Sequence, residues 1–180
     1  DIGRLETVTE RFSKIGAKPN LEQHDVNQVI SNTITYLKNR LSKNVKFTQH
    51  GSEGEVLASM NVPLLEWVVE NIIKNGVDAI RGDGNIDVLI TDQSQFIYID
   101  ISDDGKGIPK GERKTVFEPG FTTKQRGWGL GLSLTKRIIE NYHSGKVFVK
   151  NSEVGVGTTF RIVLNKNMQN GRDIHSYSFL

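Results

Sequence analysis

The stretch Glu70-Asn-Ile-Ile-Lys-Asn-Gly-Val-Asp-Ala-Ile80 has the apolar spacing of a buried helix, yet it carries two asparagines and an aspartate. Asparagine is a modest helix former that prefers caps and turns, so Asn71, Asn75 and Asp78 need an explanation. At about 100° per residue, these three side chains lie within about 60° of one another on the helix. A second face, centred about 130° away, is predicted to point to the core and contains Leu65, Val68, Val69, Ile72, Gly76 and Ile80.

The polar face of this helix lacks the Lys, Arg and Glu that a solvent-exposed face favours. Glu70 and Lys74, spaced i to i+4, supply such a pair on a third side. Amide oxygens suit a hard cation that is already bound to phosphates, because Mg²⁺ takes oxygen ligands and keeps several waters and substrate oxygens. The alternative is a hydrated asparagine face with local hydrogen bonds, and this stretch alone leaves both open.

Composition limits the classes of protein that the 180-residue chain can represent. It holds 23 basic and 21 acidic residues, a net charge of +2, which is too balanced to indicate a nucleic-acid protein. Cysteine is absent, which excludes disulfides and thiolate metal sites. We see no signal peptide and no run of about 18 apolar residues that would span a bilayer, and we expect a cytoplasmic domain.

Basic residues and glycines concentrate in one segment. Residues 105–131 contain six Lys or Arg against two Glu, and seven of the 18 glycines. This composition predicts a loop that closes over an anion. We expect no nucleic-acid partner, because the segment lacks interleaved aromatic residues.

Periodicity predicts the remaining elements. Helices are expected at 1–15, at 25–42 with Asp25 as N-cap, from Pro63 to about Ile80, and at 130–142. Strands are expected at 45–49 and 55–59 around a turn at 51–54, and as hairpins at 86–91 with 96–102 and at 146–151 with 158–164. The predicted fold is an α/β two-layer sandwich, with a mixed, mostly antiparallel sheet of about five strands covered on one face by three helices.

Two further motifs follow strands. Asp103-Asp-Gly-Lys-Gly-Ile-Pro109 places a carboxylate at a strand end before a tight turn, where it can accept a hydrogen bond from an amino group such as that of adenine; an ordinary acidic turn is the alternative. Gly127-Trp-Gly-Leu-Gly-Leu132 precedes a helix, where backbone N–H groups can approach phosphates. It is neither a Walker A loop nor a dinucleotide fingerprint, because GK[ST] is missing and Leu132 occupies the third glycine position.

Together these segments resemble the catalytic ATP-binding domain of bacterial two-component sensor histidine kinases, within the superfamily of gyrase, HSP90 and MutL ATPases. The resemblance covers about residues 20–164, and its motifs come in family order: an N box at 71–78, a G1 box at 103–107, an F box at 117–124, a G2 box at 127–131 and a final GxGT at 155–158. It implies the Bergerat-type ATP-binding fold, with ATP and Mg²⁺ as cofactors.

The resemblance also implies roles for individual residues. Asn75 would ligate Mg²⁺, Asn71 would support the metal or the phosphates, and Asp103 would accept the adenine amine with Thr158 behind it. The other implied nucleotide contacts are Asp78, Gly105, Gly107, Ile108, Phe117, Thr122, Thr123, Lys124, Gly127, Gly129, Leu130, Gly131 and Leu132. Phe117 is either a core residue or an anchor of the lid. Asp78-Ala79 departs from the more usual basic-aromatic pair and resembles nitrogen-regulation kinases.

Two positions indicate the reaction. The superfamily's ATPases carry a glutamate general base four residues before the metal asparagine, where this chain has Asn71, which favours transfer to a histidine over hydrolysis. The family's acceptor setting, H-[DE]-x-x-[NT], is matched only imperfectly by His24 to Gln28. We therefore expect a fragment of an ATP-dependent protein histidine kinase that cannot phosphorylate itself. The alternatives are an ATP-hydrolysing module and a non-catalytic nucleotide-binding module.

The expected organisation has three parts: the end of a dimerisation helix and linker at 1–18, the ATP-binding domain at 19–165, and a polar tail at 166–180. The implied partners are the histidine-containing dimerisation domain of the parent chain and the receiver domain of a response regulator. The full-length parent would be a homodimer that could be anchored in the inner membrane.

Overall fold

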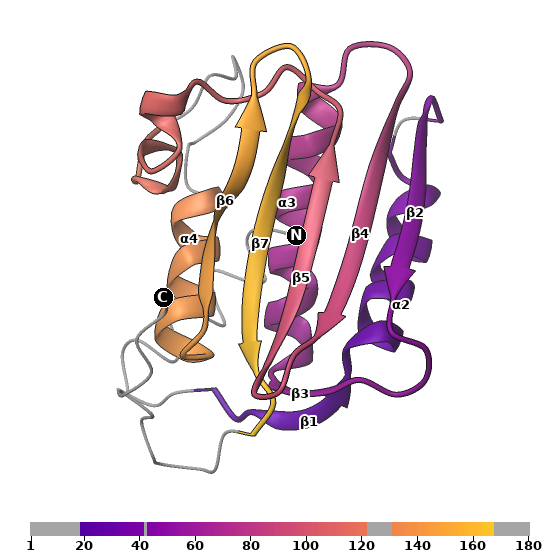
Figure 1. The fold of residues 1–180 in the computed structure, drawn as a ribbon, viewed down its shortest axis with the longest axis vertical. Coiled ribbons are helices and arrows are strands. Elements are labelled where there is room, and N and C mark those ends of the chain that lie inside the picture. Colours follow the sequence, from indigo (N-terminus) through magenta and orange to yellow (C-terminus); the bar gives the residue numbers. More distant parts are fainter. Residues whose placement is uncertain (1–18, 42, 122–130, 168–180) are drawn as a thin grey trace.

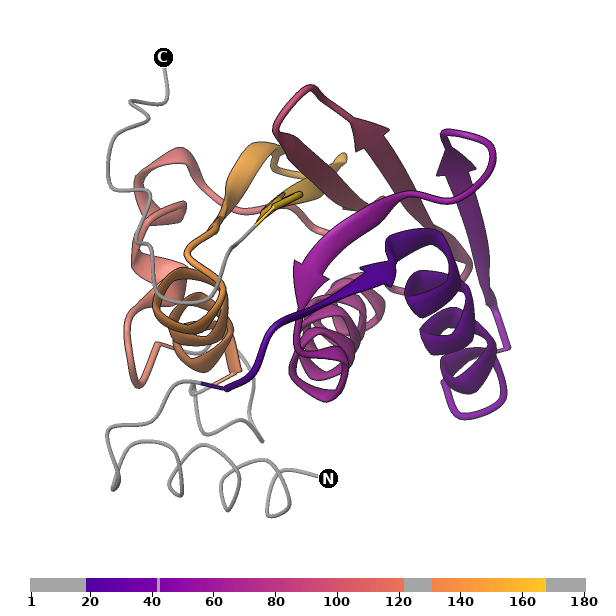
Figure 2. The same cartoon turned by 90° about the horizontal axis from the view of Figure 1, so that it is seen from below.

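The computed structural model describes residues 19–41, 43–121 and 131–167. Five strands form the main sheet in the order β2-β4-β5-β7-β6, and two more, β1 and β3, form a small separate sheet (Figure 1). Figure 2 shows that the helices lie together on one face of the main sheet. The predicted two-layer α/β class is therefore confirmed. None of the helices in the described part of the chain is long and apolar enough to cross a membrane.

The main sheet contains β2 (Val45–Gly51), β4 (Gly84–Asp92), β5 (Phe96–Asp103), β6 (Lys146–Glu153) and β7 (Gly157–Asn165). The small sheet pairs β1 (Glu22–Asp25) with β3 (Leu57–Met60). The helical layer contains α2 (Val26–Lys38), α3 (Val62–Ala79), α4 (Gly131–Arg137) and the π-helical turn η3 (Ile138–Tyr142). Two 3₁₀ turns, η1 (Lys110–Glu112) and η2 (Thr115–Phe117), follow β5.

The two strands expected around the turn at 51–54 do not pair with each other. Strand β2 runs parallel to β4, and β3 pairs antiparallel with β1 instead of with β2. The backbone at Val56 explains the departure, because its N–H donates to the Asp25 carboxylate at 3.0 Å and its carbonyl accepts from the Val26 N–H at 2.8 Å. These bonds draw the chain after the turn towards the start of α2. Strand β1 escaped prediction because Glu-Gln-His-Asp has no apolar alternation.

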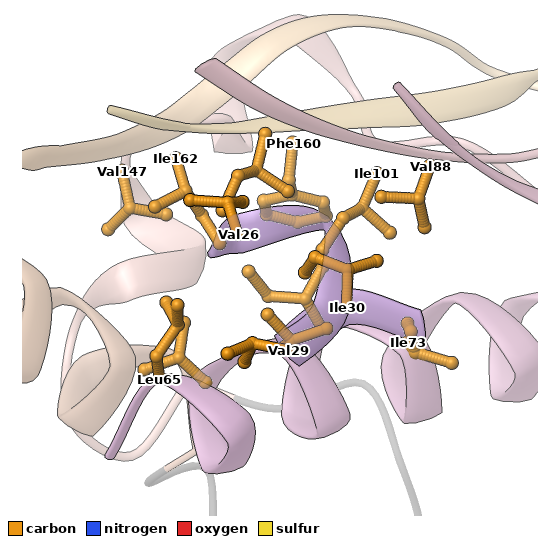
Figure 3. Close-up of a cluster of buried hydrophobic side chains, with 14 of the residues drawn as sticks. Val26, Val29, Ile30, Leu65, Ile73, Val88, Ile101, Val147, Phe160 and Ile162 are labelled. Atoms are coloured by element: carbon orange, nitrogen blue, oxygen red, sulfur yellow. The ribbon is translucent and has the colours of Figure 1, made fainter. Parts of the chain in front are cut away.

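Helix α3 forms the centre of the hydrophobic core. Asn61 caps it, accepting the Leu64 N–H at 3.2 Å, and Pro63 lies in its first turn. Its buried face consists of Leu64, Leu65, Val68, Val69, Ile72, Ile73 and Gly76. Figure 3 shows how side chains of this helix and of α2 meet the inward-pointing residues of the sheet. The predicted core face is confirmed except at Ile80, which is only partly buried at the end of the helix.

His143 joins the end of the α4–η3 segment to the beginning of α3. Its Nδ1 lies 2.9 Å from the Ile138 carbonyl and its Nε2 lies 3.1 Å from the backbone N–H of Asn61. The neutral ring with a proton on Nδ1 satisfies both partners, because a carbonyl only accepts and an N–H only donates. Burial lowers the pKa of His143. The ring therefore sets the position of the α4 segment relative to α3.

Candidate functional site

The carboxylate that ends β5 lies directly against α3. A Cβ atom added to Gly76 would lie 3.2 Å from the Cβ of Asp103 and 3.3 Å from its Oδ2. Asp103 therefore meets α3 on its core-facing side, and Asn75 is the preceding residue of the helix. A side chain at position 76 would press on Asp103 and on Ile86, whose Cδ1 would lie 2.9 Å from the added Cβ, so the glycine permits this close contact.

The environment of Asp103 raises its proton affinity. Its Oδ1 accepts the backbone N–H of Gly105 at 2.9 Å, and the backbone N–H of Thr158 also donates to the carboxylate. Burial nevertheless prevails over these bonds and raises the pKa of Asp103 to about 6. An ionised, half-buried carboxylate that keeps unused lone pairs is a strong acceptor for an amino group.

The next residue, Asp104, has a structural role. It is exposed and accepts from Asn85 twice, from the backbone N–H at 2.9 Å and from the side-chain amide at 3.0 Å. Partial burial raises the pKa of Asp104, but the hydrogen bonds from Asn85 outweigh it and leave the pKa below its ordinary value. The two adjacent carboxylates thus differ, one facing α3 and the other holding the start of β4.

The glycine turn after Asp103 is held between α3 and the β6–β7 hairpin. A Cβ at Gly105 would lie 2.7 Å from the Ala79 backbone, and one at Gly107, where φ is +76°, would lie 2.2 Å from the Glu153 carbonyl oxygen. Both approaches exclude any side chain. On the same strip of chain, the Lys106 N–H donates to the Ala79 carbonyl at 3.0 Å and the Lys106 carbonyl accepts the Gly155 N–H at 2.8 Å. Gly105 and Gly107 therefore shape this end of the site by close packing.

Thr158 lies opposite Asp103 in the antiparallel pair of β5 and β7, and it is buried. Its Oγ1 lies 2.7 Å from the Oγ of Ser152 on β6. Ser152 was not singled out from sequence. A register shift between Val149 and Asn151 moves it onto this face of the sheet, and strict alternation along β6 would not reveal it.

Asn71 contacts the first two turns of α4. Its Nδ2 donates to the Thr135 hydroxyl at 3.2 Å, and a Cβ on Gly131 would lie 2.5 Å from its Oδ1. The Asn71 amide is half-buried, as is that of Asn75 one turn later, whereas Asp78 is exposed. The polar face of α3 thus borders α4.

The donor set fits a cation that brings its own ligands. No group of three or more His, Cys, Asp or Glu side chains in residues 19–41, 43–121 and 131–167 could hold a metal ion. A cation on the polar face of α3 would take amide oxygens from Asn75 or Asn71 and the rest from phosphates and water, which is the coordination that Mg²⁺ accepts.

The remaining predicted site residues divide into two groups. Ile108 and Leu132 are half-buried and pack on the core, and Phe117 is buried with its ring edge-to-face on Phe160 at 6.0 Å between centroids. Phe117 therefore contributes to the core. The predicted lid and G2-box positions Thr122, Thr123, Lys124, Gly127, Gly129 and Leu130 lie outside the described residues.

An open hollow of about 530 Å³ lies away from these residues, between the start of α2 and the turn after β2. Several of its polar side chains already have protein partners. The amide of Asn27, for example, donates to the carbonyls of Ser52 at 3.0 Å and of Gly54 at 2.8 Å. We therefore place the candidate site at Asp103 and α3.

Comparisons with known proteins identify the family of the chain. The family model described as "Histidine kinase-, DNA gyrase B-, and HSP90-like ATPase" matches residues 60–168. Sporulation kinase E of Bacillus subtilis is 34% identical over 169 residues, which are 91% of this chain and 22% of that protein. Nitrogen regulation protein NtrY of Azorhizobium caulinodans is 29% identical over 181 residues, again 91% of this chain and 22% of that protein. The chain therefore spans only about a fifth of the length of these relatives.

Solved structures show the same fold. The catalytic domain of histidine kinase ThkA has a TM-score of 0.75 and 25% identity, and the match covers 82% of this chain and 97% of that domain. ThkA in complex with the response regulator protein TrrA has a TM-score of 0.73 and 24% identity, covering 92% of this chain and 48% of that one. The chain is homologous to sensor histidine kinases and belongs to the histidine kinase-, DNA gyrase B- and HSP90-like ATPase family.

Proposed function

We propose that this chain binds Mg·ATP and donates its γ-phosphoryl group to a histidine on a dimerisation domain, as part of two-component signal transduction. The observation that carries the proposal is the contact of Asp103 with α3 at Gly76, one residue from Asn75. Asp103 accepts the adenine amine there, and the amide face of α3 leads from the base towards the start of α4. ATP bound along this path has its base at the carboxylate and its phosphates near Asn75 and Asn71.

The metal site in this proposal consists of few protein ligands. The Asn75 side-chain oxygen holds Mg²⁺, and Asn71 supports the metal or the phosphates. Bound Mg²⁺ neutralises charge on the phosphate oxygens during transfer. Because neutral amides add no negative charge beside a triphosphate, they suit this position better than carboxylates.

The contacts of α3 favour transfer over hydrolysis. A general base must reach the attacking water, and the position of the ATPase glutamate holds Asn71, whose amide donates to Thr135. The neighbouring Glu70 instead pairs with Lys74, with 2.8 Å between Oε1 and Nζ. Water activation therefore lacks a carboxylate at this position, and an external imidazole supplies the nucleophile.

The proposed partners follow from this activity. The acceptor is the histidine-containing dimerisation domain of the parent chain. The full-length parent is a homodimer, and this domain lies in the cytoplasm. The phosphoryl group then passes to the receiver domain of a response regulator. The complex of ThkA with TrrA supports the last step. The predicted lid residues, Thr122 to Lys124 among them, stay predictions.

The decisive experiment mixes this chain with a separately produced dimerisation domain from the same parent and γ-labelled ATP with Mg²⁺. Acid-labile label on the histidine of that domain is the expected result. Label released only as free phosphate would identify an ATPase. Nucleotide binding without transfer or hydrolysis would identify a non-catalytic module. A dimerisation domain with His→Gln at the acceptor controls for labelling of other residues.

A further inference from the structure

Three side chains form a row across the sheet at the candidate site. Asp103 on β5 is the cross-strand partner of Thr158 on β7, and Thr158 is the partner of Ser152 on β6. Directly paired residues in an antiparallel sheet point to the same face. Figure 1 shows the end of β5, the end of β6 and the start of β7 together at one end of the sheet. The register shift between Val149 and Asn151 brings Ser152 into the row. Without the shift, Asn151 would pair with Thr158.

The Ser152 hydroxyl has three neighbours. The Ile108 N–H donates to its Oγ at 2.8 Å, the Gly157 carbonyl lies 3.1 Å away, and the Thr158 Oγ1 lies 2.7 Å away. The Arg113 guanidinium also donates to the Ser152 carbonyl. The serine is thus held by the turn that follows Asp103 as well as by its own hairpin.

The number of protons determines the direction of each bond. A serine hydroxyl has one proton and two acceptor lone pairs. Ile108 occupies one lone pair, and the Gly157 carbonyl can only accept, so it takes the serine proton. The Thr158 hydroxyl then donates to the second lone pair of Ser152. If Ser152 instead donated its proton to Thr158, the Gly157 carbonyl would lose the serine as a donor. The proton of the buried Thr158 hydroxyl would then point away from Ser152, which is unfavourable.

This direction has a consequence for ligand binding. With its own proton committed to Ser152, Thr158 Oγ1 presents only lone pairs to the site. The ionised Asp103 carboxylate likewise only accepts. The exocyclic group of a base that reaches this row meets acceptors alone, which match a 6-amino group and reject a 6-carbonyl.

We propose that Ser152 is a positioning residue for base selectivity, which orients the Thr158 hydroxyl so that the site takes purines with a 6-amino group and rejects those with a 6-carbonyl. The inference rests on the proposed function, because it assumes that Asp103 and Thr158 meet the base. It assigns to Ser152 a role that acts through Thr158, without contact with the nucleotide.

The test compares two ligands that differ at this position. Dissociation constants for ADP and inosine diphosphate are measured by calorimetry with Mg²⁺, and their ratio is the readout. The wild type should prefer ADP. Ser152→Ala frees the Thr158 proton to donate to a carbonyl and should reduce the preference three- to tenfold, the range of one neutral hydrogen bond. Ser152→Thr keeps a hydroxyl and should restore the preference.

The neighbouring row supplies a matched control. Ser102 and Thr159 form a second pair of hydroxyls 2.7 Å apart on β5 and β7, on the opposite face of the sheet. Ser102→Ala should leave the ratio unchanged. In a Thr158→Val background, Ser152→Ala should also have no effect on the ratio, because the hydroxyl through which it acts is gone.

Each outcome distinguishes the inference from the proposed function. If Ser152→Ala weakened the binding of ADP and of inosine diphosphate by the same factor, the substitution would have damaged the turn at Ile108, and the selectivity role would be overturned. A ratio that changes by the same factor in the Thr158→Val background would also overturn it, because the effect would not pass through Thr158. Wild-type protein that binds neither ligand would overturn both proposals, whereas an ADP preference that survives Ser152→Ala would overturn this one alone.

Discussion

Lowering the pH from 7.5 to 5.0 should weaken ADP binding, because the Asp103 carboxylate becomes protonated over this interval. Its pKa in the ligand-free protein is raised to about 6, mainly by burial. If only the ionised carboxylate binds the adenine amine, the apparent affinity falls with the ionised fraction, which is about one-tenth at pH 5.0 and nearly complete at pH 7.5. We therefore expect about a tenfold increase in the dissociation constant over this interval.

The assay is calorimetric titration with ADP and Mg²⁺ at half-unit steps of pH, with circular dichroism to verify that the protein stays folded. Because the ADP phosphates also titrate, Asp103→Asn provides the background slope. At pH 7.5 this variant should bind ADP about 10- to 150-fold more weakly, or about 1.5–3 kcal/mol. Asp104→Asn, which alters the carboxylate bonded to Asn85, should keep the wild-type affinity and slope.

Two results would refute this reasoning. Parallel pH profiles for the wild type and Asp103→Asn would show that Asp103 does not titrate with binding. Wild-type affinity in Asp103→Asn at pH 7.5 would show that the carboxylate does not meet the base.

Three further predictions concern the metal, the helix contact and stability. Asn75→Ala should abolish the Mg²⁺ dependence of ADP binding and block phosphoryl transfer, and an unchanged Mg²⁺ titration would exclude Asn75 as a ligand. Relative to Gly111→Ala, Gly131→Ala should lower the free energy of unfolding by about 1 kcal/mol, measured by urea denaturation. Its Cβ would lie 2.5 Å from Asn71 Oδ1 and would push that amide away from its bond with Thr135. Gly111→Ala, with no atom within 4 Å of its Cβ, is the control. The folded-state pKa of His143 lies below its ordinary value of 6.5, so the unfolded chain binds the proton first and the free energy of unfolding should fall as the pH drops below about 6.5. His143→Gln should remove this part of the pH dependence, and identical pH profiles of urea midpoints in the two proteins would contradict it.

Local sequence was enough to predict the elements whose side chains follow a strong period. The three faces of α3 are those expected from its spacing, including the ion pair of Glu70 with Lys74. The hairpin of β4 with β5 and that of β6 with β7 are also confirmed. Ile80 does not lie on the predicted core face because α3 ends there. Its backbone is extended, so the helical period no longer determines where its side chain points.

Strand partners were less predictable than strands. The segments β2 and β3 were both expected on either side of a turn, but they pair with β4 and β1 and not with each other. The turn between them has ordinary hairpin chemistry, and the bonds of Val56 with Asp25 and Val26, about 30 residues earlier in the chain, determine where the second strand goes. The carboxylate of Asp25 was predicted as an N-cap, which is confirmed by its bond to Asn27 at 3.1 Å, but its second bond to Val56 was not foreseen.

The sequence by itself determined the residue types of the candidate site and the elements that carry them, because apolar period, caps and glycine turns act over a few neighbouring residues. Only the tertiary structure decided which of those residues meet. The contact of Asp103 with Gly76, the packing of Asn71 on Gly131 and the arrival of Ser152 beside Thr158 each join segments separated along the chain or shifted by a bulge. Such contacts depend on strand register and on the close approach of backbones, which no local period encodes.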